Sequence, residues 1–593
     1  VRELLVKQHS STTSSGRSTD AQELAAALGL LDDLRVEEVF YRLRLNPLSG
    51  FHQYAEYAQA AVTSRNDSLD MQLRDQIFAF VQDNFKGQSE LGGLRRDVIE
   101  RDSALRWGWR AVYAHELDEA KALIHHMREV DPDFLGTDAD ASLAWAELDI
   151  IEGWADAFLG KEHPPAEKSL RKALYVLQHL VTDSEFEDRQ RKVLLAQAYF
   201  ALGYLLRAQG RYQAAAENYR SALPLWRELK READHAEVLN NLGFAQAEAG
   251  KFLRALRYTQ DGLDMRVKLS YRYPIALSLN TLGLVEVKND QPHRGRVHCE
   301  QALAIFRDLE MPRGIGLALT ALAEAHRRRA ELENLYSVEQ RIADLSEASK
   351  HAQQAVDIFR RQVSEPLRLV DALIELGCAY RNWALLISPT EAGHDLIREG
   401  LISRAKTALE EAAEAAGSTF NSRQVDAFVN LASLYYRAGC EDERVEESLR
   451  SAEAVIPQGY CIFEGKGLPH VEDPITPLWV QLSKIHTLRG EMAMRDYNKA
   501  APPGTRPVRD EGLLSRVSEH FTLSLAYAEL FADDYRELRR AKDTIYRQFH
   551  GANVAEFHVI YHGVRATALK YDLESRPATV QGPARPRMRY FLE

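Results

Sequence analysis

The chain has 593 residues, a formal net charge of −12 and a hydrophobic content of 45%. This length exceeds that of one compact core, so we expect several domains or a repeat array. The acidic balance argues against nucleic-acid binding through a basic surface. Four widely separated cysteines argue against a disulfide framework and against a cysteine-rich zinc site. Without a long apolar run or a signal peptide, the chain is expected to be cytoplasmic, with no membrane partner.

The first hundred residues, 1–100, predict a helical N-terminal cap or adaptor rather than a repeat. The polar stretch STTSSGRSTD at 11–20 predicts a flexible linker. Apolar residues at helical spacing in VEEVFYRLRL and LRDQIFAFVQ predict helices between 21 and 100. Because the chain begins with Val1 and not with methionine, we expect it to be part of a longer protein.

A period of forty residues organises the middle of the chain. Gly203, Gly243 and Gly283 recur at this spacing, each inside an apolar helical pattern. Glycine within a helix costs about 1 kcal/mol relative to alanine, and we expect close packing between two helices to offset that cost. Gly210 and Gly250 fall between the paired helices, where a turn can use a positive φ. Each period therefore predicts two helices joined by a short turn.

Small, apolar and aromatic residues occupy matching positions in three successive units. They are Tyr199, Leu202, Gly203, Gly210, Tyr212, Ala215, Tyr219 and Ala222, then Leu239, Leu242, Gly243, Gly250, Phe252 and Ala255, then Leu279, Leu282, Gly283 and Ala302. This pattern resembles the tetratricopeptide repeat, in the longer form of kinesin-light-chain-like proteins, most clearly over 194–306. The resemblance implies an all-α, right-handed superhelical solenoid of antiparallel helix pairs with helical N- and C-terminal caps.

Weaker matches extend the predicted solenoid over 101–457. Insertions near 330–343 and 387–398 interrupt the period. Cys299 and Cys378 occupy small-residue packing positions, which predicts structural roles. Beyond 457, the segment 458–593 predicts a divergent helical region that ends in a proline-rich, basic tail.

The first helix of each pair is expected to line a concave groove. If the register holds, eight side chains face it: Phe200, Tyr204, Arg207, Asn240, Asn241, Phe244, Asn280 and Asn430. Asparagine offers both a donor and an acceptor to the backbone of an extended peptide, and aromatic rings supply apolar contact area. The resemblance implies a protein or peptide ligand in this groove. The alternative is that these residues merely form a surface.

Other polar clusters give weaker hypotheses. The basic run Arg327, Arg328 and Arg329 could hold an acidic peptide or a phosphate, or could be a solvated helix end. His558 and His562 share one helical face, but a third metal ligand is missing, so no metal site is predicted. Phosphate-binding loops and hydrolase motifs are not found. The sequence therefore predicts no cofactor and no enzymatic activity.

Two non-catalytic roles follow, with an enzyme hidden in 458–593 as a third and weaker hypothesis. Long arrays of this subtype follow the nucleotide-binding core of STAND signalling ATPases, which are similar to NLR receptors. That resemblance implies a ligand-sensing or scaffolding region of a larger signalling protein, in contact with an upstream NTPase or effector domain. The alternative is a stand-alone adaptor or co-regulator that assembles a protein complex.

Overall fold

A computed structural model describes most of the chain. The described residues are 14–64, 66–114, 116–135, 139–159, 163–182, 184–269, 272–388, 394–417, 419–466, 469, 471–500, 511–531, 563, 566–567 and 570–571. The chain divides into two compact units. Unit 1 comprises residues 1–205, 217–241 and 260–278, and unit 2 comprises residues 206–216, 242–259 and 279–593.

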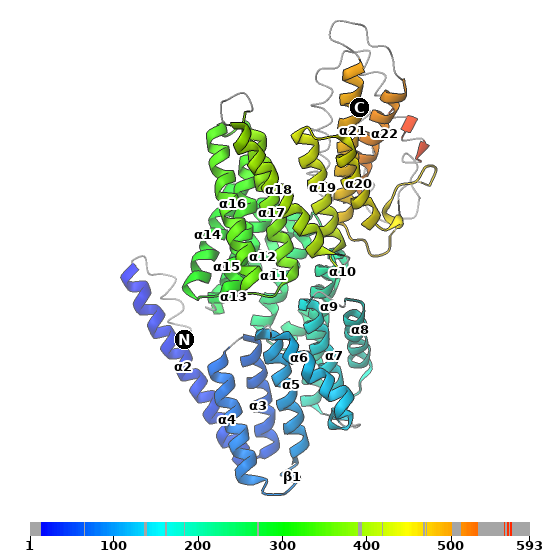
Figure 1. The fold of residues 1–593 in the computed structure, drawn as a ribbon. Coiled ribbons are helices and arrows are strands. Elements are labelled where there is room, and N and C mark those ends of the chain that lie inside the picture. Colours follow the sequence, from blue (N-terminus) through cyan, green and yellow to red (C-terminus); the bar gives the residue numbers. More distant parts are fainter. Residues whose placement is uncertain are drawn as a thin grey trace. The chain divides into compact units, whose positions relative to one another are not determined.

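The described residues of unit 1 are almost entirely helical (Figure 1). A short antiparallel hairpin pairs β1 with β2, with Leu91 opposite Leu94. The elements that lie wholly in unit 1 are α2 (Ser14–Leu45), α3 (Pro47–Ser64), α4 (Asp67–Asn84), β1 (Glu90–Leu91), β2 (Leu94–Arg95), α5 (Arg96–Ala114), α6 (Leu117–His125), η1 (His126–Val130), η2 (Pro132–Leu135), α7 (Ala139–Leu159) and α8 (His163–His179).

Five helices contribute residues to both units, and the later helices belong to unit 2. The five are α9 (Glu185–Ala208), α10 (Tyr212–Glu228), α11 (Glu232–Glu248), α12 (Phe252–Leu269) and α13 (Arg272–Lys288). Unit 2 continues with α14 (Pro292–Asp308), α15 (Pro312–Ala330), α16 (Val338–Arg361), α17 (Pro366–Leu386), α18 (His394–Ala416), α19 (Asn421–Ala438), α20 (Asp442–Val455), η3 (Gln458–Tyr460), α21 (Pro477–Ala500) and α22 (Glu511–Phe531).

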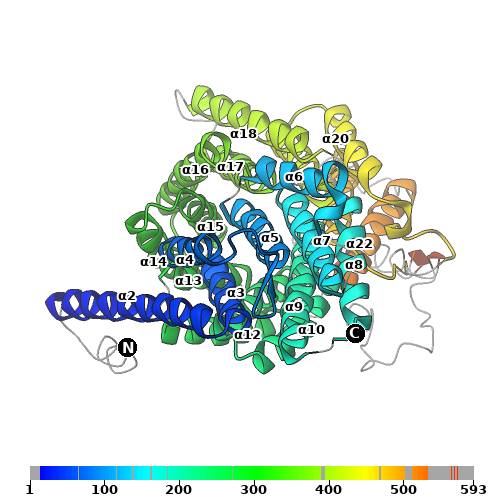
Figure 2. The same cartoon turned by 90° about the horizontal axis from the view of Figure 1, so that it is seen from below.

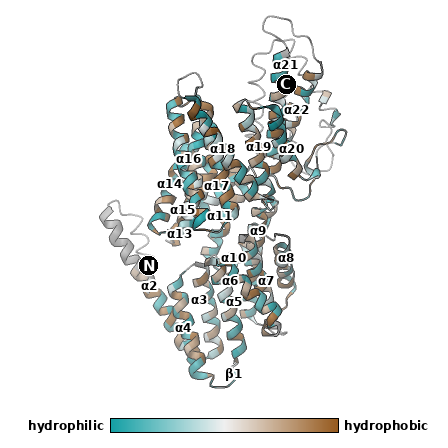
Figure 3. Ribbon diagram, viewed as in Figure 1, coloured by the Kyte–Doolittle hydropathy of each residue, from teal (hydrophilic) through white to brown (hydrophobic). Residues whose placement is uncertain are grey.

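Consecutive helices pack against one another along unit 2. Figure 2 shows α15, α16, α17 and α18 following one another, and each contacts the next. Hydrophobic and hydrophilic residues are interspersed along the helices in Figure 3, as amphipathic packing requires. The predicted fold class, an all-α helical solenoid, is confirmed. In the described part of the chain, no helix combines the length and apolar character needed to cross a bilayer.

The ends of these helices follow from local sequence. Proline stands in the first turn of α14, α15 and α17, where its missing N–H costs nothing. Ser337 and Gln340 form a capping box at the start of α16. Helix α2 begins at Ser14, so the structure places helix over most of 11–20, where the sequence predicted a flexible linker. Serine and aspartate are frequent at helix starts, and composition alone did not separate the two outcomes.

The repeat glycines occupy the turn and close-packing positions that their spacing predicted. Gly210 and Gly250 adopt φ of 79° and 76° in the turns between paired helices. A Cβ at Gly203 would lie 2.6 Å from Cε1 of Tyr219. A Cβ at Gly243 would lie 3.0 Å from the backbone nitrogen of Thr259. Turn and close-packing glycines thus alternate along the repeat.

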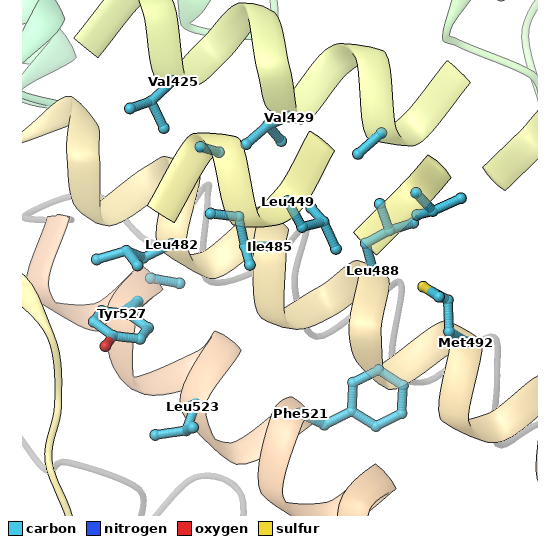
Figure 4. Close-up of a cluster of buried hydrophobic side chains, with 14 of the residues drawn as sticks. Val425, Val429, Leu449, Leu482, Ile485, Leu488, Met492, Phe521, Leu523 and Tyr527 are labelled. Carbon is cyan, nitrogen blue, oxygen red and sulfur yellow. The ribbon is translucent and has the colours of Figure 1, made fainter. Parts of the chain in front are cut away.

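Each unit has its own hydrophobic core. In unit 1 the largest buried side chains of this core include Tyr54, Phe80 and Phe85. In unit 2 a cluster joins α19, α20, α21 and α22, and Figure 4 shows Leu488 and Phe521 among its side chains. Helix α21 therefore has a buried apolar face, which fixes where its polar face lies.

Candidate functional site

The eight predicted groove residues divide between the two units. Phe200, Tyr204, Asn240 and Asn241 belong to unit 1, and Arg207, Phe244, Asn280 and Asn430 belong to unit 2. In unit 1, Phe200 and Tyr204 pack on Trp154, with ring centroids 5.5 and 5.0 Å away. The Asn241 side chain donates to the carbonyl oxygen of Glu237 at 3.0 Å. Asn240 is buried, and its Oδ1 has no hydrogen-bond partner.

Unit 2 contains a cavity of about 490 Å³ that brings three of the predicted residues together. Phe244, Asn280 and Asn430 all line it. Its wall is built mainly from α11, α13, α15, α17, α19 and α21, which are the first helices of successive pairs. We call this cavity, with its lining residues from Phe244 to Glu491, the unit 2 groove. Arg207 contacts one of its residues, because its guanidinium carbon lies 4.9 Å from the centroid of the Phe244 ring.

Charged side chains of both signs line the unit 2 groove in near-equal numbers. The acidic ones are Glu248, Glu324, Glu331, Asp371, Glu375, Asp426 and Glu491, and the basic ones are Lys288, Arg327, Arg328, Arg368, Arg381, Arg423, Arg437 and Lys484. They pair across neighbouring helices. Lys288 Nζ lies 3.0 Å from Glu248 Oε1, and Arg423 Nε donates to Asp371 Oδ1 at 2.7 Å. Thus the groove is strongly polar but has no dominant charge.

The pairing fixes the charge states of the buried groups. Burial opposes the charge on Lys288, but Glu248 and Glu324 outweigh it and raise the pKa of that amine. Burial likewise opposes the charge on Arg423, and Asp371 holds the pKa of its guanidinium well above the ordinary value. These cations are therefore charged throughout the physiological range, and they are held in place by their carboxylate partners.

The three arginines of the basic run at 327–329 pair with different acidic side chains. Arg327 is 6% exposed, and it donates to Glu375 from Nε at 2.7 Å and from Nη2 at 3.0 Å. Arg328 Nη1 lies 3.2 Å from Glu331 Oε2. Arg329 Nε lies 3.0 Å from Asp344 Oδ2. Each guanidinium is paired with a carboxylate of the chain, so the three do not form one open basic patch.

The polar side chains of the groove differ in whether the chain already satisfies them. Asn430 Oδ1 accepts from Arg381 at 2.6 Å, and its Nδ2 donates to Asp426 Oδ1 at 3.0 Å. Asn280 and Gln481 are each 5% exposed, yet in the described part of the chain Asn280 Oδ1 and Gln481 Oε1 are buried without a hydrogen-bond partner. A buried acceptor without a partner costs stability. Within the described residues, these two are thus the groove amide oxygens that the chain leaves unsatisfied.

The remaining sequence hypotheses concern two cysteines, a histidine pair and metal binding. Cys299 and Cys378 are buried, and burial raises the pKa of both thiols, as packing positions require. His558 and His562 lie outside the described residues. Among the residues that the structure describes, no group of three or more potential ligands could hold a metal ion.

One family model matches part of this chain. Residues 194–266 match the family model of the tetratricopeptide repeat. This match covers two glycines of the forty-residue period, Gly203 and Gly243, so the helix pairs of this region are repeats of the tetratricopeptide type. Comparison with curated proteins gives no match.

Several solved structures share a similar succession of helices. A Rap protein complexed with competence and sporulation factor is 17% identical, with a TM-score of 0.45, covering 76% of this chain and 99% of that one. The apo quorum sensor NprR from B. thuringiensis is 11% identical, with a TM-score of 0.37, covering 75% and 99%. BtubC from P. vanneervenii is 24% identical, with a TM-score of 0.28, covering 44% and 91%. At these scores, the similarities assign no function.

Sequence reasoning missed most of the charged lining of the unit 2 groove. One signal was available, because Glu248, Lys288 and Arg328 stand forty residues apart, at the period of the repeat glycines. Gln481 gave no such signal, since it lies beyond 457, where the repeat pattern had faded. Its place in the groove follows from the packing of α21 on the core of unit 2.

Proposed function

We propose that the unit 2 groove binds an extended peptide, or an extended segment of a protein partner, without catalysis. One observation carries the proposal: Asn280 Oδ1 and Gln481 Oε1 are buried in the groove lining without a partner. A peptide backbone presents N–H groups at regular intervals, and two of them would satisfy these acceptors. Phe244, Leu284 and Leu317 add apolar surface for side chains of the ligand.

The mixed charges restrict the ligand further. Because most of the lining cations and anions are already paired, a strongly acidic or strongly basic peptide would gain little from them. Recognition would instead rest on backbone hydrogen bonds and on the fit of apolar side chains. We therefore expect a peptide of low net charge.

The test starts from peptides selected from a random display library on the purified chain. Asn280→Leu and Gln481→Met replace each unpartnered oxygen by an apolar group of similar size. Each substitution is expected to leave stability unchanged or higher, and to weaken peptide binding roughly threefold to tenfold for one neutral hydrogen bond. The matched control is Leu253→Ala on α12, a side chain that is 79% exposed and does not line the groove.

Three results would contradict the proposal. Equal affinity of the selected peptides for the parent chain and for both groove variants would place binding elsewhere. Loss of stability in both variants would show that the oxygens have structural partners. Failure to select any peptide would also count against a peptide groove.

The biological role extends this proposal. We propose a ligand-sensing or scaffolding region of a larger STAND-type signalling protein, supported by the resemblance of the forty-residue array to such regions. The alternative is a stand-alone adaptor that assembles a protein complex. The gene sequence upstream of Val1 separates them, because only the first role requires a nucleotide-binding domain there.

A further inference from the structure

A second cavity, of about 360 Å³, lies within unit 1 among α3, α5, α7 and α9. Its volume is within the range of small-molecule sites, roughly 300 to 1,000 Å³. None of the predicted groove residues lines it. Much of its wall is apolar, formed by Leu48, Phe51, Val98, Leu105, Leu143 and Leu194.

The lining of this cavity includes a buried guanidinium that the described residues satisfy only in part. The Arg106 side chain is 5% exposed, and its Nη2 donates to Asp102 Oδ1 at 2.8 Å. Among the described residues, neither the buried Arg106 Nε and Nη1 nor the buried Asp102 Oδ2 has a hydrogen-bond partner. Buried charged groups in native proteins are normally paired and fully hydrogen-bonded. The unpaired donors and the unpaired acceptor therefore point to a ligand that supplies both kinds of partner.

A second carboxyl group completes the charge pattern. Glu147 lines the cavity from α7, and its Oε1 accepts from Trp109 Nε1 at 2.7 Å. Burial raises the pKa of Glu147, although Arg106 lies close enough to oppose the rise. Arg95, Arg101 and Glu187 also line the cavity, so its charged groups are of both signs. A ligand with a single charge of either sign would be repelled by one set of these groups.

We propose that this cavity binds a free apolar α-amino acid. The α-carboxylate accepts hydrogen bonds from Arg106, the α-ammonium donates to Asp102 Oδ2, and the side chain packs against the apolar wall. A zwitterion matches the charge pattern because its ammonium and carboxylate are bonded to one carbon, and the Arg106 guanidinium and the Asp102 carboxylate likewise lie side by side, 2.8 Å apart. A side chain the size of leucine or phenylalanine suits the volume and the lining.

The first experiment is calorimetric titration of the full chain with leucine and phenylalanine. The matched controls are 4-methylpentanoic acid, which lacks the amine, and 3-methylbutylamine, which lacks the carboxylate. Each charged group contributes a charge-assisted hydrogen bond, so each control ligand is expected to bind about tenfold to a hundredfold more weakly than leucine. Serine, which has no apolar side chain, is expected to bind weakly as well.

Two variants then locate the site. Arg106→Gln removes the charge that holds the carboxylate. Ala144→Phe fills the cavity from α7 and leaves the ion pair of Arg106 and Asp102 in place, so it serves even if Arg106→Gln does not fold. Both variants are expected to lose leucine binding. Asn280→Leu, in the unit 2 groove, is expected to retain it, which separates this site from the peptide groove.

Three results would overturn the proposal. The first is the absence of binding by every apolar amino acid at millimolar concentration. The second is equal binding of leucine and 4-methylpentanoic acid, which would show that the ammonium is not recognised. The third is undiminished leucine binding by a folded Ala144→Phe variant, which would place the ligand elsewhere.

Discussion

Substituting Gly243 by alanine tests whether close packing explains the glycine period. Gly243 lies in α11, and an added Cβ would lie 3.0 Å from the backbone nitrogen of Thr259 and 3.1 Å from the carbonyl oxygen of Ala255. It would lie closer still to the Thr259 hydroxyl. Two of these three atoms belong to the backbone of α12, which cannot rotate away as a side chain can. The two helices must therefore move apart.

The magnitude follows from two opposing effects. Alanine is favoured over glycine within a helix by about 1 kcal/mol. Overpacking of a tight contact costs about 1–3 kcal/mol, and the backbone contacts place Gly243 toward the upper end. The net expectation is a loss of about 1–2 kcal/mol. Gly400→Ala in α18 is the matched control, because its Cβ would meet nothing within 4 Å. That variant is expected to gain up to about 1 kcal/mol.

Amide hydrogen exchange measures the stability of each helix separately. It suits a repeat protein, which need not unfold in one step. Protection of α11 and α12 is expected to fall in Gly243→Ala, and protection of α18 is expected to rise in Gly400→Ala. In a Thr259→Ala background, the cost at Gly243 is expected to shrink but to persist, because the backbone contacts remain. A gain in protection from Gly243→Ala equal to that at Gly400 would refute the packing argument.

Two further substitutions test the electrostatics of unit 2. Arg327→Met leaves the Glu375 carboxylate buried without its partner, so we expect the free energy of unfolding in chemical denaturation to fall by about 3–5 kcal/mol. The double variant Arg327→Met/Glu375→Met should recover most of this loss. Equal losses in the single and double variants would contradict this expectation. Burial lowers the pKa of His520 to about 4 from an ordinary 6.5, so the unfolded state binds protons first as the pH falls. Protonation of this group therefore lowers the free energy of unfolding by about 3 kcal/mol as the pH falls from about 6.5 to 4. In His520→Gln, amide hydrogen exchange of α21 and α22 should depend less on pH than in the parent or in the exposed control His179→Gln. An unchanged pH dependence would refute the assignment of this effect to His520.

The helices and their close contacts were predictable because their causes are local. The forty-residue spacing of Gly203, Gly243 and Gly283 located positions where two helices meet, and the structure places neighbouring atoms within contact distance of each added Cβ. Gly210 and Gly250 marked the turns, because a positive φ is a property of one residue. Such features need no knowledge of what lies far along the chain.

Groove chemistry was less predictable because hydrogen-bond partners come from distant segments. Asparagine at the right register predicted a free amide for Asn280 and Asn430 alike. At Asn430 the amide is engaged by Arg381, which lies 49 residues away, and by Asp426 on its own helix. At Asn280 the amide oxygen has no partner. Register alone places a side chain on the groove face, but it does not show whether neighbouring helices satisfy that side chain.

The paired charges of the unit 2 groove change how its ligand would be selected. A groove with unpaired cations attracts any acidic segment, whereas Lys288 and Arg423 are already neutralised by Glu248 and Asp371. Breaking such pairs to admit a charged ligand costs more than a new pair returns. Under the proposed function, discrimination would therefore shift to groups that lack a partner among the described residues, such as Asn280 Oδ1. Because an unsatisfied buried acceptor penalises the empty groove, a ligand with the matching N–H would relieve that penalty, and a ligand without it would bind more weakly.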